Sequence, residues 1–200
     1  PVARPAAYVG LIAIIFAGLG LAITGDQQAK IMYAQQPGKM SAAESLCVGQ
    51  EGAPFSILTI GNLNGTVGDP AACDDLMHLF SVPNLTSFLA TGHFTGPESY
   101  VPGTNDVQAD FTQRFGEEYG TDMQYIPNLM ISYWSFRFMI GFAAFSGALA
   151  IWGLWVLRKG RVTDSKWFSR MALVALPAPF LANSFGWIFT ELGRQPWVVV

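Results

Sequence analysis

The sequence predicts an all-α membrane protein with three transmembrane helices and a long irregular loop between the first and the second. The first observation is composition: 51% of the 200 residues are hydrophobic and 12% are charged, whereas soluble domains carry roughly a quarter charged residues. The second is three apolar runs, each long enough to span a bilayer. The third is a separation of acidic from basic residues along the chain. The net charge of -3 gives no reason to expect a nucleic-acid partner.

The first transmembrane helix is predicted over residues 1–24, where Ala6–Thr24 is an uncharged run. Its glycines and alanines suit close packing against other helices. If the helix continues beyond the membrane, Asp26, Lys30 and Tyr33 share one face, with an Asp to Lys pair four residues apart. Taken alone, this pattern indicates a solvated extension with one surface ion pair of little energy.

Residues 25–127 form a long loop that is rich in Gly, Pro, Asn, Ser and Thr and only weakly periodic. We therefore expect irregular structure with short helices. After the break at Pro37-Gly38, a short helix is expected to carry Lys39 and Glu44. Because these two residues are five positions apart, they do not share a helix face.

The loop contains both cysteines of the chain, Cys47 and Cys73, and both histidines, His78 and His93. Outside the cytoplasm, a Cys47–Cys73 disulfide is a better interpretation than a metal site or a reactive thiol. The histidines do not have ligand-like spacing to the cysteines, so the pattern does not predict a zinc site.

The second transmembrane helix is predicted over residues 128–157 and is interrupted by one charge, Arg137. Met139 follows two positions later. Methionine most often fills a hydrophobic core, but it is also an axial haem ligand, and an intramembrane arginine is a natural partner of haem propionates. Side chains two residues apart on a helix diverge by roughly 160°. Arg137 must therefore reach around to a haem edge or serve a different neighbour.

A short cytoplasmic loop, residues 158–166, leads to the third predicted transmembrane helix, residues 167–192. Pro177 and Pro179 are expected to kink this helix or to break its hydrogen-bond ladder. Near its end, spacing of four places Asn183, Trp187 and Glu191 on one face. Such a polar and aromatic stripe is expected to point into protein rather than lipid.

Basic residues set the predicted orientation. Arg4 precedes the first apolar run, and Arg158, Lys159 and Arg161 lie between the second and third, so both of these ends are expected to be cytoplasmic. The loop 25–127 is then extracytoplasmic, and it holds twelve acidic residues against three basic ones. The final turn, residues 193–200, is expected on the same outer side.

Three motifs, in order along the chain, resemble subunit I of the cytochrome bd family of quinol oxidases, in its carboxy-terminal part and with a short Q loop. The most specific is the pentapeptide Gly193-Arg194-Gln195-Pro196-Trp197, with Glu191 two residues before it. On its own, this motif also fits a capped helix end with a snorkelling Arg194 and an interfacial Trp197. The other two motifs are Gly25-Asp26 with the segment Lys39-Met40-Ser41-Ala42-Ala43-Glu44, and Trp134-Ser135-Phe136-Arg137 followed by Met139.

The resemblance implies roles for individual residues. Met139 corresponds to the ligand of the low-spin haem b iron, with Arg137 supporting that haem. Glu191 corresponds to the ligand of the high-spin haem b iron. Without the family, a buried and protonated Glu191 that hydrogen-bonds Arg194 or the backbone is the simpler interpretation. Trp187, between the high-spin haem and haem d, and Arg194 match cofactor-binding residues. Asp26, Lys39 and Glu44 match residues that bind and oxidise quinol.

The resemblance also implies a function. Such a subunit is a multi-pass protein of the bacterial plasma membrane that oxidises menaquinol or ubiquinol and reduces O₂ to water through the two haems b and haem d. It generates a proton motive force without pumping. Neither histidine lies in a predicted transmembrane helix, so the haem histidine ligands are expected from amino-terminal helices of subunit I. We expect this chain to be a piece of a longer polypeptide or a split subunit, acting with subunit II in membrane lipid.

A different class of function remains open. The chain also fits a non-catalytic membrane scaffold or receptor subunit whose acidic outer loop binds a partner. The absorption spectrum of the purified complex separates the two interpretations, because an oxidase shows the bands of reduced haem and a scaffold does not.

Overall fold

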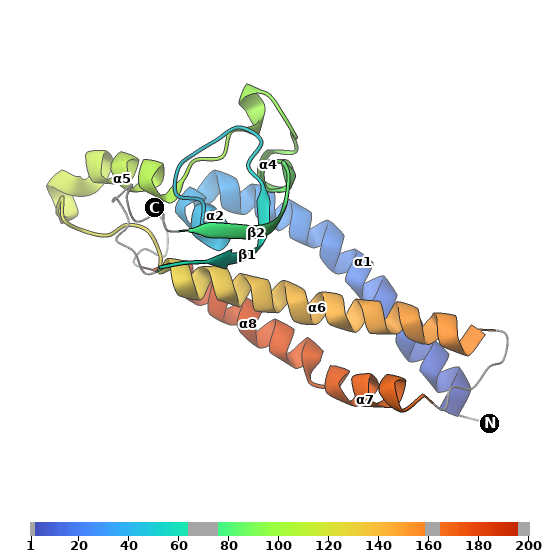
Figure 1. Ribbon diagram of the computed structural model, residues 1–200. Coiled ribbons are helices and arrows are strands. Elements are labelled where there is room, and N and C mark those ends of the chain that lie inside the picture. The colour runs from blue at the N-terminus through green and yellow to red at the C-terminus, as the bar shows by residue number, and fades with distance from the viewer. Residues whose placement is uncertain (1–2, 64–75, 159–164, 196–200) are drawn as a thin grey trace. The chain divides into compact units, whose positions relative to one another are not determined.

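The computed structural model describes residues 3–63, 76–158 and 165–195, which form helices and one small two-stranded sheet (Figure 1). The chain divides into two compact units. The first unit comprises Pro1–Gly25 and Phe138–Gly186, and the second comprises Asp26–Arg137 and Trp187–Val200.

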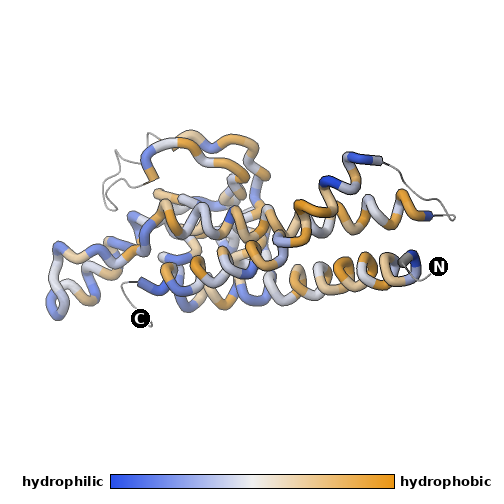
Figure 2. Tube along the Cα trace, turned by 90° about the horizontal axis from the view of Figure 1, so that it is seen from below, coloured by the Kyte–Doolittle hydropathy of each residue, from blue (hydrophilic) through white to orange (hydrophobic). Residues whose placement is uncertain are grey.

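The long helices confirm the three transmembrane segments expected from the sequence. They are α1 (Ala3–Gln35), α6 (Leu129–Leu157), and the pair α7 (Lys166–Ala175) and α8 (Ala178–Leu192). Within the described residues, three helical segments are long and apolar enough to cross a membrane. Hydrophobic residues predominate along them, whereas helix α5 (Thr104–Tyr119) is mostly hydrophilic (Figure 2). Helix α1 continues past the uncharged segment to Gln35 and so includes Asp26, Lys30 and Tyr33.

Close packing in the first unit depends on small residues, as expected for membrane helices. A Cβ atom at Gly153 of α6 would lie 3.0 Å from Leu11 Cδ1 of α1 and 3.5 Å from the Phe168 ring of α7. The Phe168 ring also meets the Trp152 ring edge-on, with 5.2 Å between centroids. At the end of α6, Tyr8 and Arg4 both donate to the Leu157 carbonyl oxygen. These contacts join α1, α6 and α7.

The prolines of the third segment interrupt its helix, as predicted. Helix α7 ends at Ala175 and α8 begins at Ala178. At the junction, the Leu176 amide donates to the Leu173 carbonyl over 3.2 Å, a contact three residues back that tightens the turn. The helical ladder resumes where the Leu181 amide reaches the Pro177 carbonyl, 2.9 Å away.

The second unit is built around the short helix α2 (Pro37–Glu44), in which Gly38–Glu44 are all buried. Proline in the first turn favours the start of this helix, and Ser45 in a left-handed conformation ends it. One side of α2 packs Met40 into a core with Ala53, Ala90 and Val101. Another side packs Ala42 against Val107, Ile126 and Leu129. The remaining elements are α4 (Leu85–Thr91), the 3₁₀ turn η1 (Pro97–Ser99), β1 (Phe55–Ile60) and β2 (Met77–Val82).

The described part of the loop contains a hairpin as well as the short helices that were expected. Strands β1 and β2 form an antiparallel hairpin whose register runs from Phe55 opposite Val82 to Ile60 opposite Met77. A positive φ of 52° at Phe80 kinks the second strand. The burial pattern is inverted, because Ser56 and Thr59 are buried while several apolar side chains of the hairpin are exposed. Such a hairpin lacks the alternation that reveals strands in a sequence.

Candidate functional site

The second unit brings Glu44 of α2 together with Arg137 of α6. The Glu44 carboxylate accepts a hydrogen bond from Arg137 Nη2 over 2.6 Å, and the two side chains are 2% and 8% exposed. A second bond, 2.7 Å long, runs from Arg137 Nε to the Ser56 carbonyl oxygen of β1. Arg137 thus serves a neighbour in the loop, one of the two options that its position on the helix left open. Sequence reasoning assigned these two residues to different sites.

Aromatic rings and one unsatisfied donor complete the surroundings of Arg137. Its guanidinium carbon lies 4.3 Å from the ring centroid of Phe55 and 4.5 Å from that of Tyr133. Its Nη1 atom is buried and has no hydrogen-bond partner within the described residues. Because an unmet buried donor of a charged group is costly, this nitrogen points to an acceptor that lies outside the described chain.

Burial raises the pKa of Glu44 to about 7, although the charge and hydrogen bond of Arg137 and a hydrogen bond from Thr86 act in the opposite direction. The Thr86 hydroxyl is also buried and donates to the Pro54 carbonyl oxygen. A carboxyl group with a pKa near neutrality can both take up and release a proton under physiological conditions.

Lys39 lies at the other end of α2 and contacts a different helix. Its Nζ atom donates to the Thr190 carbonyl oxygen of α8 over 3.3 Å and lies 4.7 Å from the centroid of the Phe189 ring. The residue is 7% exposed. Burial and the nearby charge of Arg194 lower the pKa of the Lys39 amine, and Glu191 raises it. Lys39 and Glu44 therefore contact different helices, which agrees with the expectation that residues five positions apart do not share a helix face.

Gly193, the first residue of the pentapeptide motif, is required by this packing. A Cβ atom there would lie 2.7 Å from Lys39 Cε and 2.7 Å from the Phe189 carbonyl oxygen. Only a residue without a side chain allows such an approach. The motif residues Pro196 and Trp197 lie outside the described residues.

Asp26, the third predicted quinol residue, forms the expected ion pair with Lys30, whose Nζ is 2.6 Å from the carboxylate. Both side chains are partly exposed, so the pair contributes little to stability. Tyr33, on the same face, donates to the Tyr100 carbonyl oxygen over 3.0 Å. This face of α1 contacts the loop.

Met139, the predicted ligand of the low-spin haem, belongs to the first unit. A Cβ atom built on Gly186 of α8 would lie 2.9 Å from its Sδ atom. The Met139 thioether therefore packs against the backbone of α8 at Gly186, where a side chain would collide with it. Met139 is half-buried.

The stripe on α8 is exposed in the described chain. Trp187 is 66% exposed, and Asn183 and Glu191 are exposed as well. The Glu191 carboxylate accepts no hydrogen bond from the residues that the structure describes. The described residues therefore do not show the buried Glu191, bonded to Arg194 or the backbone, that the sequence alone favoured. An acid in an apolar helix is usually paired, and Glu191 has no hydrogen-bonded partner among the described residues.

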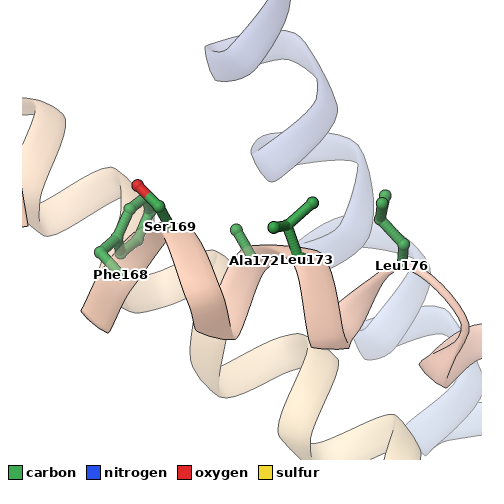
Figure 3. A pocket seen from close by; sticks show the side chains of 5 residues that line it. All are labelled: Phe168, Ser169, Ala172, Leu173 and Leu176. Carbon is green, nitrogen blue, oxygen red and sulfur yellow. The ribbon is translucent and has the colours of Figure 1, made fainter. Parts of the chain in front are cut away.

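These donors fit haem groups. The Met139 thioether and the exposed Glu191 carboxylate are ligand types that haem irons accept, and the Arg137 N–H that lacks an acceptor among the described residues suits a propionate. By contrast, the shallow apolar pocket beside α7 holds no titratable side chain (Figure 3). Its lining therefore offers no acid, base or metal ligand. The pocket is lined by Phe168, Ser169, Ala172, Leu173 and Leu176.

Sequence reasoning missed a row of polar groups beside Glu44. The Ser45 hydroxyl donates to Thr59 Oγ1 over 3.2 Å, and Thr59 Oγ1 lies 2.9 Å from both Ser56 Oγ and His78 Nδ1. Serine and threonine in a loop have no pattern that distinguishes such a row from ordinary turn residues. The predicted Cys47–Cys73 disulfide stays a prediction, because Cys73 lies outside the described residues.

Comparisons with known proteins agree with the motifs. The family described as "Cytochrome bd terminal oxidase subunit I" matches residues 1–200. Cytochrome bd ubiquinol oxidase subunit 1 of Bacillus subtilis is 34% identical over 194 residues, which is 96% of this chain and 38% of that protein. A putative cytochrome bd menaquinol oxidase subunit I from the same organism is 30% identical over 89% of this chain and 34% of its own length.

A solved structure has the same fold. The bd oxidase from Geobacillus thermodenitrificans matches with a TM-score of 0.73 and 24% sequence identity, over 98% of this chain and 39% of the matched chain. The chain thus spans about two fifths of the length of the proteins that it resembles. Because the family match extends over every residue, the chain belongs to the cytochrome bd terminal oxidase subunit I family.

Proposed function

We propose that this chain forms the quinol-oxidising part of a membrane terminal oxidase that reduces O₂ to water. The observation that carries the proposal is the buried pair of Glu44 and Arg137, joined over 2.6 Å. Oxidation of a quinol removes two electrons and two protons, so the site needs a base that is ionised near neutral pH. Glu44, with a pKa of about 7, is such a base.

The two ends of α2 have different tasks in this proposal. Glu44 accepts a proton from a quinol hydroxyl, and the fixed charge of Arg137 stabilises the carboxylate that does so. Lys39 supplies a donor for the quinol oxygen at the end of α8, where its amine already lies 3.3 Å from the Thr190 carbonyl. Asp26 contributes through its ion pair with Lys30, which fixes the face of α1 toward the loop.

The haems implied by the family are assigned to residues that fit them. Met139 would hold the iron of the low-spin haem b and Glu191 that of the high-spin haem b, with Trp187 toward haem d. When bound, these groups carry the two electrons and reduce O₂. The buried Nη1 atom of Arg137 supports a propionate partner, and Arg194 adds a second positive charge near Lys39.

The proposed oxidase contains more than this chain. The subunit acts in the bacterial plasma membrane with subunit II and with amino-terminal helices of subunit I, which supply the histidine ligands. The loop 25–127 faces the extracytoplasmic side, so quinol protons are released there and a proton motive force forms without pumping. The two relatives named for their quinols, one ubiquinol and one menaquinol, support a quinol substrate of either kind.

The test is to purify the complete complex that contains this chain and to measure its spectrum and its oxygen uptake together. We expect the absorption bands of reduced haems b and d and consumption of O₂ with an added quinol. A colourless complex that takes up no oxygen would identify a scaffold or receptor subunit instead.

A further inference from the structure

A buried row of hydroxyl groups leads from the end of α2 to the surface of the hairpin. Ser45 follows Glu44 directly and is held in a left-handed conformation, with φ of 47°. From there, Thr59 of β1 receives the Ser45 hydrogen bond and lies 2.9 Å from His78 Nδ1 of β2. Ser45 and Thr59 are 0% and 1% exposed, whereas His78 is exposed.

The hydrogen bonds of this row can all point outward. Ser45 donates to Thr59, and Thr59 has one hydroxyl proton, which it gives to His78 Nδ1 when the neutral imidazole carries its own proton on Nε2. Ser56 fits this direction when its hydroxyl donates to Thr59 Oγ1, 2.9 Å away, which leaves the Thr59 proton for His78. A proton that arrives at the Ser45 oxygen can therefore pass along two hydroxyls to the imidazole.

The surroundings of His78 favour the neutral imidazole, which is the form that can accept a proton from Thr59. Burial, and then the charge of Arg137 on α6, lower the pKa of the imidazole, so it is neutral at pH 7 and its Nδ1 can accept a proton. Among the described groups, Thr59 is its polar contact on β1, and the carboxylate of Glu44 neutralises much of the Arg137 charge. A histidine at the surface can then release the proton from Nε2 to water.

We propose that His78 is the outer proton acceptor of quinol oxidation, reached through Ser45 and Thr59. The inference rests on the proposed function, because it concerns the protons of that reaction. Quinol loses two electrons to the haems and two protons to the protein. Glu44 takes one proton, and the other moves along the hydroxyl row to His78 Nδ1 while the Nε2 proton leaves to the outer solution.

The test compares matched variants of the complete oxidase complex. Thr59→Val removes the hydroxyl and keeps the shape of the side chain, whereas Thr59→Ser keeps the hydroxyl. We expect Thr59→Val and His78→Phe each to slow quinol oxidation roughly tenfold or more, while Thr59→Ser retains the rate. Because both groups lie on one path, the double variant should be no slower than the slower single variant. Added imidazole should restore part of the rate of His78→Phe.

A control separates proton transfer from damage to the hairpin. Oxygen consumption with an artificial one-electron donor that releases no proton should be the same in Thr59→Val, His78→Phe and the wild type. His93→Phe changes the other histidine of the loop, which contacts Glu98 over 3.4 Å, and should retain both activities. A loss with both kinds of donor in Thr59→Val would overturn the relay in favour of a structural role.

The wild-type complex distinguishes failure of this inference from failure of the proposed function. If the wild type does not oxidise quinol, the proposed function itself is wrong. If the wild type oxidises quinol and both Thr59→Val and His78→Phe do so at the same rate across pH 6 to 9, only the relay is wrong.

Discussion

Glu44 in the loop and Glu191 on α8 are both acids beside apolar helices, but their surroundings differ. Glu44 is 4% exposed and has its cation, Arg137, within the same chain. Glu191 is exposed and receives no hydrogen bond from the described residues. An acid whose cation belongs to the same chain can be pre-organised before its substrate binds. The Glu191 face has no such partner among the described residues, and the proposed function assigns it to a haem iron.

The largest expected effect is on the haem spectrum, when Glu191 is replaced. Replacing Glu191 by Ala should remove the high-spin haem signal from the spectrum of the reduced complex, because the iron loses its carboxylate ligand. Glu44→Ala provides the matched control, since it changes an acid that already has a protein partner, and all haem signals should remain. Three intact haems in Glu191→Ala would refute the ligand role.

Replacing Glu44 should change the kinetics of the complex and leave its spectrum unchanged. Glu44→Gln retains the size of the side chain but cannot take up a proton, so quinol oxidation should slow by roughly 10²-fold. Haem content should stay normal. Steady-state oxygen uptake with quinol measures the rate, and an unchanged rate would remove Glu44 from the site.

The pH dependence sharpens the difference further. Since the base form of Glu44 is the active one, the rate should rise with pH through about 7, the pKa of its carboxyl. Arg137 lowers that pKa, so Arg137→Gln should move the midpoint upward by roughly one to three pH units, and Arg137→Lys should move it less. A rate profile of Arg137→Gln that coincides with the wild type would contradict this coupling.

The stability of the folded loop should depend on the Glu44 carboxyl too, but it should fall with rising pH where the rate of quinol oxidation rises. The pKa of Glu44 is higher in the folded chain than its ordinary value of 4.5, so the folded state binds more protons between about 4.5 and 7. Stability of the loop is therefore greatest below about 4.5 and decreases as pH rises to about 7.

The smallest expected effect is at the junction of the two regions. Gly193→Ala places a Cβ atom 2.7 Å from Lys39 Cε, and the overlap should destabilise the complex by about 1 to 3 kcal/mol. Thermal unfolding of the purified complex measures the change. Gly147→Ala on α6 is a suitable control, because a Cβ atom there meets no heavy atom within 4 Å. Equal melting temperatures for both variants would show that Lys39 does not pack on Gly193.

The sequence predicted what depends on local chemistry. Hydropathy located the three long helices, Pro177 and Pro179 indicated the break between α7 and α8, and the spacing of Asp26 and Lys30 predicted their ion pair. These features need only neighbouring residues or helix periodicity.

Contacts between distant residues were not predictable in this way. Glu44 and Arg137 are 93 positions apart, and no periodicity relates a loop carboxylate to an arginine in a transmembrane helix. The hairpin was missed because its buried residues, Ser56 and Thr59, are polar. The motif resemblance named Glu44, Arg137 and Lys39 separately, and only the fold shows that Arg137 belongs with Glu44 and that Lys39 belongs with α8.

The most direct measurement is the structure of the intact oxidase with a non-oxidisable quinol analogue bound. We predict that the analogue's hydroxyl groups lie within hydrogen-bonding distance of Glu44 and Lys39, and that iron is bonded to Met139 and Glu191. An analogue bound away from α2, or Met139 and Glu191 in contact only with protein or lipid atoms, would contradict the proposal.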